Sequence, residues 1–329
     1  MRRTSNWPAL LYGVLLVLVG GAVFLASPLV ASAAWLLGVG EWQQVLPRLL
    51  LASSVLIWIG LLLSALDLFV LLPSKRRGLA VRNEAPRQLD VTVALTAYND
   101  EESIGLATAD FMAHPRVRRV IVVDNNSRDG TALAAERAGA LVVKEERPGY
   151  GWCVYRALTE AMRFDDTDLT LLCEGDMTFR ASDIDKFLAY IPHADIVNGT
   201  RIVEQLRQRQ TQLSTFMYYG NFFVGKLLEV KHIGKGTFTD VGTTYKLCRN
   251  EALRRLLPLL NPRINLEFNA FFLDTALTHN IQIVECPVTF HRRVGTSKGG
   301  NVNNMRALMV GTRIIAGILT GWRTSGART

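Results

Sequence analysis

Two long apolar stretches near the amino terminus, residues 9–34 and 49–72, constrain this chain more than any other feature. Each is longer than the about 20 residues that cross the hydrocarbon core of a bilayer. Asp67 is the only charged residue within them, and the segment 40–48 between them is short and polar. We therefore expect a helical hairpin that crosses a membrane twice.

The residues that flank this hairpin predict its orientation. Arg2 and Arg3 precede the first stretch, and a basic run at 75–77 follows the second. Because basic flanks stay on the cytoplasmic side, we expect an integral membrane protein whose termini and remaining chain are cytoplasmic. A cleaved signal peptide is the alternative for the first stretch, since residues 31–33 resemble a cleavage site. The length of the stretch and the second stretch that follows favour the hairpin.

The chain after the hairpin divides into three parts. Residues 74–90 are basic and read as a linker, and residues 301–329 contain an apolar stretch with two arginines, which suits an amphipathic helix in a membrane interface. Over 91–300, strands alternate with helices, which favours an α/β domain with a mostly parallel sheet. The expected domains are thus a transmembrane hairpin over 1–73, this linker, this α/β domain and this terminal helix and tail.

Individual elements of the α/β domain can be predicted as well. Strands are expected over 91–96, 117–123, 141–143 and 168–173, and later ones over 241–248 and 281–290. A long helix rich in aromatic residues is expected over 210–230.

Acidic residues follow two of the predicted strands. Asp124 follows the strand 117–123, and Glu174 and Asp176 follow the strand 168–173. The carboxyl ends of strands are where an open α/β sheet binds ligands, and carboxylate oxygens suit Mg²⁺ or Mn²⁺. We therefore expect a nucleotide and a divalent metal here, and a nucleotide-sugar enzyme is the first hypothesis. A helix-capping turn residue is the alternative for Asp124, and two chance acids in a solvated loop for the other pair.

Five short motifs stand in a fixed order along the α/β domain, at residues 96–101, 122–131, 174–176, 198–201 and 293–298. Together they resemble the motifs of family 2 glycosyltransferases of the GT-A fold. Within that family the chain is similar to polyprenyl-phosphate glycosyltransferases of the dolichol-phosphate mannose synthase group. The resemblance implies a Rossmann-like catalytic domain. It also implies an inverting, metal-dependent transferase that moves a sugar from a nucleotide diphosphate sugar to a polyprenyl phosphate at the cytoplasmic membrane face.

The resemblance assigns residues to the donor side of the site. It places Thr96, Tyr98 and Glu101 near the base and ribose, with Asp124 accepting a hydrogen bond there. Glu174 and Asp176 would hold the Mg²⁺ or Mn²⁺, although the family usually has two aspartates at these positions. Arg293 and Lys298 would contact the diphosphate. Gly149 lies in a turn before a helix, where it allows a phosphate or sugar hydroxyl to approach, or simply connects strand to helix.

Arginines and one aspartate are expected on the acceptor side. Arg201, Arg207 and Arg209 would hold the acceptor phosphate, because a guanidinium binds phosphate bidentately. A solvated surface or a lipid-headgroup contact is the alternative for the last two. Asp240 resembles an acidic position of the family and joins Asp176 as a catalytic candidate. Since a phosphate monoester is already anionic at neutral pH, Asp240 would orient the acceptor or support the metal, or be a structural turn acid.

Two further acids have open roles. Glu267 matches an acid on a helix of the family and would recognise the sugar or support a neighbouring basic residue. Asp67, in the second apolar stretch, is close enough in sequence to the membrane interface to reach it or to pair with Lys75.

The expected partners are a UDP- or GDP-linked sugar, a polyprenyl phosphate and membrane lipids, with no nucleic acid among them. The oligomeric state is left open, a homo-oligomer included. Two other functions also stay open. One is a family 2 enzyme that acts on another lipid or glycan, although the Gln-x-x-Arg-Trp motif of processive synthases is absent from the sequence. The other is a membrane-anchored protein that binds nucleotide sugars without turnover.

Overall fold

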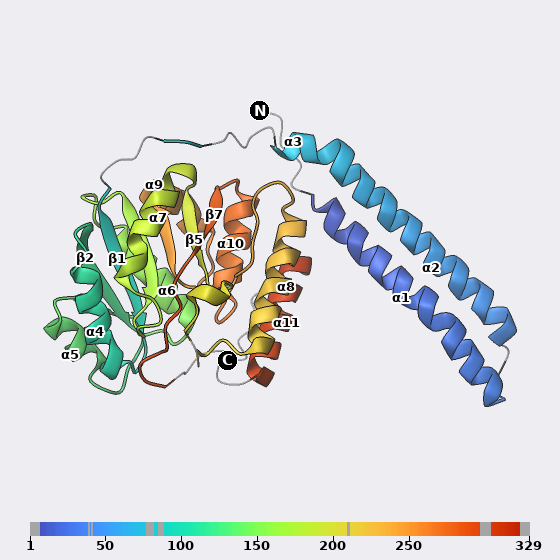
Figure 1. Cartoon of the computed structure of the whole chain (residues 1–329), viewed down its shortest axis with the longest axis horizontal. Coiled ribbons are helices and arrows are strands. Elements are labelled where there is room, and N and C mark those ends of the chain that lie inside the picture. The colour runs from blue at the N-terminus through green and yellow to red at the C-terminus, as the bar shows by residue number, and fades with distance from the viewer. Residues whose placement is uncertain are drawn as a thin grey trace. The chain divides into compact units, whose positions relative to one another are not determined.

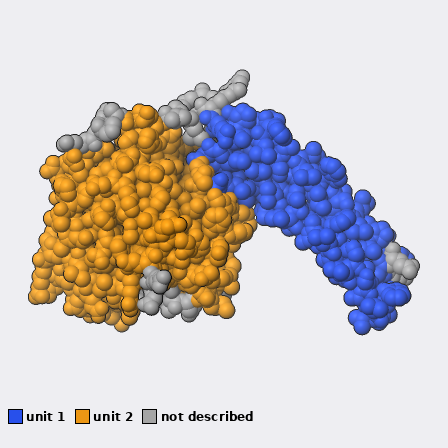
Figure 2. Space-filling view, in the orientation of Figure 1, with its two compact units in different colours: residues 1–80, 229–235 blue, residues 81–228, 236–329 orange. Residues whose placement is uncertain are grey.

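A computed structural model describes residues 7–38, 40, 42–76, 82–84, 89–208, 211–296 and 304–322. The chain divides into two compact units, residues 1–80 with 229–235 and residues 81–228 with 236–329 (Figure 2). Two of the predicted site residues, Arg209 and Lys298, lie outside the described residues.

The first unit contains two apolar helices that pack side by side (Figure 1). They are α1 (Ala9–Leu36) and α2 (Trp42–Ala65), and α2 continues through a π-helical segment, Leu66–Leu71, into α3 (Leu72–Arg76). The helices approach closely where Gly13 meets Gly60, because a Cβ on Gly13 would lie 2.6 Å from the Gly60 carbonyl oxygen. Residues 9–36 and 44–76 are each long and apolar enough to cross a membrane, so both are candidate spans.

Asp67 joins the ends of these helices. Its carboxylate is fully buried, lies 2.7 Å from the Lys75 ammonium, and accepts a 2.7 Å hydrogen bond from the backbone N–H of Leu10. Lys75 also donates to the Trp7 carbonyl at 2.8 Å. The predicted pairing of Asp67 with Lys75 is confirmed, and the same carboxylate satisfies one of the backbone donors that every helix leaves unpaired at its first turn.

The second unit is built on a seven-stranded sheet with the order β3-β2-β1-β4-β6-β5-β7. Strand β6 runs antiparallel to both of its neighbours, and all other pairs are parallel. The predicted mostly parallel α/β sheet is therefore confirmed. The strands are β1 (Val91–Ala97), β2 (Val117–Asp124), β3 (Leu141–Lys144), β4 (Leu169–Glu174), β5 (Ile196–Thr200), β6 (Lys246–Arg249) and β7 (Ile283–Pro287).

Helices cover both faces of this sheet, so the central strands are buried on both sides. One apolar cluster packs the sheet against α6, α8, α9, α10 and α11, and the other packs it mainly against α4, α5 and α7. The predicted amphipathic helix near the carboxyl terminus is present as α11. The helices are α4 (Glu101–Met112), α5 (Thr131–Arg137), α6 (Tyr150–Ala161), α7 (Ile184–Tyr190), α8 (Thr215–Lys231), α9 (Asn250–Leu256), α10 (Phe268–Thr278) and α11 (Asn304–Thr320).

Candidate functional site

Two adjoining cavities open at the carboxyl end of the parallel strands. The first, of about 620 Å³, lies between helices α8 and α11 and is called the α8–α11 cavity here. The second, of about 590 Å³, is lined by residues that follow β1 and β2 and by the start of α6, and is called the β1–β2 cavity. Tyr150, Glu174, Leu266 and Arg293 line both cavities, so the two meet at these side chains.

Five of the predicted donor residues line the β1–β2 cavity: Thr96, Tyr98, Gly149, Glu174 and Arg293. Asp124 and Glu101 are absent from the described residues that line it. Asp124 accepts a 3.1 Å hydrogen bond from the Ser127 N–H in the turn after β2, and Glu101 accepts a 3.0 Å bond from the Gly130 N–H before α5. Their contacts to a donor therefore stay predictions. The cavity is also lined by residues to which no substrate contact was assigned, four of them within the motifs and two, Asn265 and Arg306, outside: Asp100, Asn125, Asn126, Arg128, Asn265 and Arg306.

Asn125 shapes the wall of this cavity. Its side-chain amide donates to the carbonyls of Glu145 and Arg147, at 3.0 and 2.8 Å, and its oxygen accepts from the Gly149 N–H at 2.9 Å. Gly149 has a φ of +128°, a conformation that only glycine adopts without strain. Asn125, which follows β2, therefore holds the turn that leads into α6. Tyr150 is the first residue of that helix.

Glu174 and Asp176 lie at the end of β4, where the two cavities meet. Oδ1 of Asp176 accepts hydrogen bonds from the N–H and hydroxyl of Thr178, at 3.0 and 2.5 Å. Oδ2 of Asp176 is buried and has no hydrogen-bond partner in the described part of the chain, although an Arg293 nitrogen lies 3.1 Å away. Burial and the neighbouring Asp176 together raise the pKa of Glu174 to about 7. One buried and one half-buried carboxylate with few donors make a place that a cation stabilises.

This pair fits a divalent metal that is shared with a diphosphate. Among the described residues, no group of three or more His, Cys, Asp or Glu side chains is arranged to hold a metal ion. The protein would therefore supply one or two carboxylate ligands. That number suits Mg²⁺, which proteins commonly bind through one or two carboxylates together with substrate phosphates and water. Oδ2 of Asp176 makes no hydrogen bond to the described residues and lies 3.1 Å from an Arg293 nitrogen, and it is the candidate ligand atom.

Arg293 lies between two acids of the site. Its guanidinium is 2.8 Å from Asp100 and 3.1 Å from Asp176, and its side chain is 12% exposed. It comes from the segment after β7, which is hydrogen-bonded to the segment after β4 through the Val294 N–H and the Asp176 carbonyl, at 3.1 Å. The structure therefore holds a positive charge beside the metal-binding candidates.

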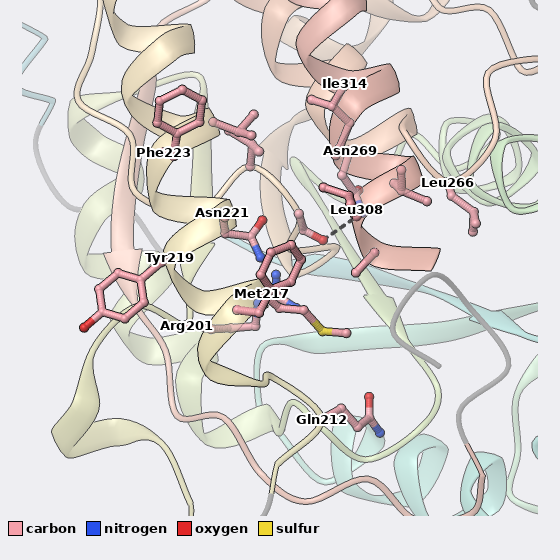
Figure 3. Close-up of a pocket in the computed structure, with 18 of the residues that line it drawn as sticks. Arg201, Gln212, Met217, Tyr219, Asn221, Phe223, Leu266, Asn269, Leu308 and Ile314 are labelled. Carbon is pink, nitrogen blue, oxygen red and sulfur yellow. Dashed lines mark hydrogen bonds between the residues drawn. The ribbon is translucent and has the colours of Figure 1, made fainter. Parts of the chain in front are cut away.

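On the other side of the junction, Arg201 and Asp240 form a buried ion pair. Nε and Nη2 of Arg201 donate to the two carboxylate oxygens of Asp240 at 2.7 and 2.8 Å. Burial opposes ionisation of Asp240, but Arg201 outweighs it and keeps the pKa of Asp240 below its ordinary value. Arg201 also lines the α8–α11 cavity (Figure 3). Asp240 therefore holds an arginine at the polar end of an apolar cavity.

The other predicted residues lie away from this junction. Arg207 pairs with Glu204 at 2.9 Å and lies over the Tyr218 ring, and it is absent from the described linings of both cavities. Glu267 lies 3.4 Å from the Arg313 guanidinium of α11, which agrees with the support of a basic residue.

A polar cluster that the motifs did not reveal completes the junction. Nδ2 of Asn269, on α10, donates to the Tyr150 hydroxyl, the Gly242 carbonyl and the Thr244 hydroxyl, at 3.0, 3.1 and 3.2 Å. The Tyr150 and Thr244 hydroxyls are 2.5 Å apart, and Thr244 donates to Oε1 of Glu174 at 2.8 Å. Asn269 gives no signal in the sequence, because its helix otherwise consists largely of core residues.

Comparisons with known proteins concern the family of the chain. The model of the family "Glycosyl transferase family 2" matches residues 92–257, about half of the chain. An uncharacterized glycosyltransferase of Mycobacterium tuberculosis is 41% identical over 112 residues, which are 34% of this chain and 48% of that protein. The chain therefore spans about half the length of this relative. A dolichyl-phosphate hexose transferase of Haloferax volcanii is 26% identical over 214 residues, 64% of this chain and 86% of that protein.

Among solved structures, glucosyl-3-phosphoglycerate synthase from Mycobacterium tuberculosis, in complex with Mn²⁺, UDP-glucose and glycerol 3-phosphate, matches with a TM-score of 0.48 and 16% identity. The match covers 72% of this chain and 82% of that one. The match to the family model, together with the mostly parallel α/β sheet, shows that this chain belongs to glycosyl transferase family 2.

Proposed function

We propose that this protein is a membrane-anchored, inverting glycosyltransferase that moves a sugar from a nucleotide diphosphate sugar to a polyprenyl phosphate. One observation carries the proposal: a cavity lined by acids, amides and arginines meets, at Glu174 and Arg293, a cavity whose helix walls are largely apolar side chains. An inverting transferase needs its leaving group and its nucleophile on opposite sides of the anomeric carbon. The two cavities offer a place for each.

The β1–β2 cavity suits the donor. Its polar lining after β1 and β2 would take the nucleoside, and Arg293 would contact the diphosphate. Glu174 and Asp176 would hold Mg²⁺ or Mn²⁺, which would neutralise charge on the departing diphosphate. Arg128 and Arg306 also line this cavity and add positive charge to it.

The α8–α11 cavity suits a lipid phosphate. Met217, Phe223, Leu308 and Ile314 point into it from the two helices, and Arg201 lies at its polar end (Figure 3). An isoprenoid chain buries apolar surface against such walls, and a guanidinium binds a phosphate at the chain's head. The likeness to a relative named dolichyl-phosphate hexose transferase supports this choice of acceptor.

The proposed reaction needs little acid–base chemistry. A phosphate oxygen of the acceptor, already anionic at neutral pH, attacks the anomeric carbon and forms a new carbon–oxygen bond. The bond from that carbon to the donor diphosphate breaks, and a nucleoside diphosphate leaves with the electron pair. Attack from the face opposite the leaving group inverts the anomeric configuration. Asp240 contributes by holding Arg201 in a charged and fixed position.

Membrane anchoring is supported by two features within the separate units. Helices α1 and α2 are candidate spans, and the basic residues on either side of them favour cytoplasmic termini and a cytoplasmic catalytic domain. In the second unit, α8 and α11 expose large apolar side chains: Phe216, Tyr219, Phe222, Phe223, Met305, Leu308 and Met309. Exposed apolar patches of this kind mark interaction surfaces, and a lipid acceptor resides in a membrane.

The test is transfer by the full chain in detergent, with a C55 polyprenyl phosphate and a panel of UDP- and GDP-linked sugars. We expect a glycolipid and a free nucleoside diphosphate with Mg²⁺ or Mn²⁺, and neither product after chelation. Arg201→Met should lower the apparent affinity for the polyprenyl phosphate. Arg207→Met is the matched control, because Arg207 lies outside the described linings of both cavities. If the donor is consumed only when a glycan or another lipid is added, that molecule is the acceptor and polyprenyl phosphate is not. Donor binding without turnover for any acceptor would contradict the proposal.

A further inference from the structure

We infer that Asn269 recognises a hydroxyl group of the transferred sugar and is held for this task by Tyr150, Thr244 and Glu174. The inference rests on the proposed function and makes it more specific, because it identifies the residue that selects the sugar. Asn269 belongs to helix α10, outside the segment that matches the family model, and is buried with 6% exposure.

The position of the sugar follows from the two cavities. The anomeric carbon must lie between the leaving diphosphate and the attacking phosphate, and therefore where the cavities meet. Tyr150 and Glu174 line both cavities and mark this place. Asn269 lines the α8–α11 cavity and bonds directly to the Tyr150 hydroxyl at 3.0 Å. Its amide is thus adjacent to the transferred ring.

The orientation of the amide is set by a chain of hydrogen bonds with one direction. A carboxylate only accepts hydrogen bonds, so the Thr244 hydroxyl donates to Oε1 of Glu174. The Tyr150 hydroxyl then donates to the Thr244 oxygen, and the remaining lone pairs of both oxygens face Asn269. The Gly242 carbonyl, which also only accepts, lies 3.1 Å from the same nitrogen of Asn269. Each of these contacts requires the NH₂ end of the amide.

The consequence is an acceptor atom presented to the cavity. The two hydrogens of Nδ2 are shared among these three acceptors. Oδ1 of Asn269 is therefore the free end of the amide, and it accepts no hydrogen bond from the residues that the structure describes. Because Asn269 lines the cavity, a sugar that enters displaces water from this oxygen, and the oxygen then carries a desolvation cost unless the sugar supplies a donor. A sugar hydroxyl is the donor that the proposed substrate brings to this place. A sugar without that hydroxyl leaves the oxygen unpaired, and a site of this kind discriminates strongly against such an analogue.

The first experiment measures binding and does not depend on turnover. Calorimetry with the full chain and Mg²⁺ compares UDP with UDP-glucose, and GDP with GDP-mannose, for the wild type and Asn269→Ala. We expect Asn269→Ala to bind the nucleoside diphosphates as the wild type does. Affinity for the nucleotide sugar should fall about tenfold, the effect of one buried hydrogen bond with its desolvation cost. Unchanged affinity for both sugars would overturn the inference.

The second experiment identifies the hydroxyl. The wild type and Asn269→Ala are given the preferred nucleotide sugar and its 2-, 3-, 4- and 6-deoxy analogues. With the wild type, we expect one deoxy analogue to have a kcat/KM about tenfold lower than that of the parent nucleotide sugar. With Asn269→Ala, the same analogue and the parent nucleotide sugar should have equal kcat/KM. Asn261→Ala is the matched control, since this amide lies outside the described linings of both cavities and bonds locally to the Arg263 N–H. Asn261→Ala should discriminate among the analogues as the wild type does. If Asn269→Ala also discriminates as the wild type does, the assignment is refuted.

The two experiments separate the inference from the proposed function. If the chain binds nucleotide sugars through Asn269 but transfers to no polyprenyl phosphate, the inference stands and the proposed acceptor is wrong. If the chain transfers to polyprenyl phosphate and the wild type and Asn269→Ala show the same analogue profile, the proposed function stands and the role of Asn269 is wrong.

Discussion

Replacing Asp240 with asparagine should destabilise the second unit strongly, because the buried Arg201 then loses its counterion. Asp240 is fully buried and accepts four hydrogen bonds. Three come from the backbone N–H, Nε and Nη2 of Arg201, and one from the Gly242 N–H at 3.1 Å. Asparagine has one acceptor oxygen in place of two and turns its NH₂ group toward existing donors. Removing one partner of a buried ion pair costs roughly 3–5 kcal/mol of unfolding free energy.

That cost can be measured as a melting temperature. In a domain of this size, 1 kcal/mol shifts the Tm by about 2–4 °C, so Asp240→Asn should lower it by roughly 6–20 °C. Thermal unfolding of the full chain in detergent, followed by tryptophan fluorescence, is the assay. Glu204→Gln is the control, since it breaks the exposed pair with Arg207 and should cost no more than about 1 kcal/mol.

The double variant Asp240→Asn, Arg201→Met tests the reason for this loss. If an unpaired buried guanidinium causes it, removing that guanidinium should restore part of the stability, so the double variant should melt above Asp240→Asn. A loss below about 1 kcal/mol in Asp240→Asn, or a double variant whose loss equals the sum of the two single losses, would refute the reasoning.

Three further outcomes follow from other contacts. Asp67→Ala should destabilise the first unit by roughly 3–5 kcal/mol, because the buried Lys75 loses its partner; a melting curve like that of the wild type would contradict this. Gly149→Ala should cost about 1–3 kcal/mol through its φ of +128° and weaken calorimetric binding of UDP, and unchanged affinity would show that the turn is not needed. Burial raises the pKa of Glu285 to about 7 from an ordinary 4.5, so the folded state favours the protonated form and this contribution to stability declines as pH rises from 4.5 through 7. The upper limit of this stabilisation is about 3 kcal/mol. The Tm of Glu285→Gln should not show this decline between pH 5 and 8. If the Tm of the wild type and of the variant change in parallel with pH, Glu285 is not the source of the decline.

The sequence predicted those parts of the fold that depend on neighbouring residues. Strands β2 and β4, which end at Asp124 and Glu174, lie within one residue of the predicted ranges, because continuous apolar runs with polar residues at their ends are a local signal. The strand expected over 241–248 was partly wrong: β6 begins only at Lys246, since the side chains of Thr243 and Thr244 are hydrogen-bonded in the preceding loop.

The candidate site was only partly predictable, because tertiary contacts decide it. The motifs placed Glu174, Asp176 and Arg293 in one site, and the structure brings them together. They did not reveal that Asp240 would be engaged by Arg201, 39 residues away in sequence. Asn269 was missed for the same reason, since its partners Tyr150 and Thr244 come from distant segments.

The α8–α11 cavity also bears on how such a protein diversifies. The segment that matches the family model, residues 92–257, carries the acids at the strand ends. One wall of the apolar cavity comes instead from α11, which begins 47 residues after that segment ends, at Asn304. If the acids activate the sugar and the cavity receives the acceptor, as proposed, these two tasks depend on different stretches of the chain. Exchanging the α11 sequence would then alter what is glycosylated without changing the acids at the strand ends.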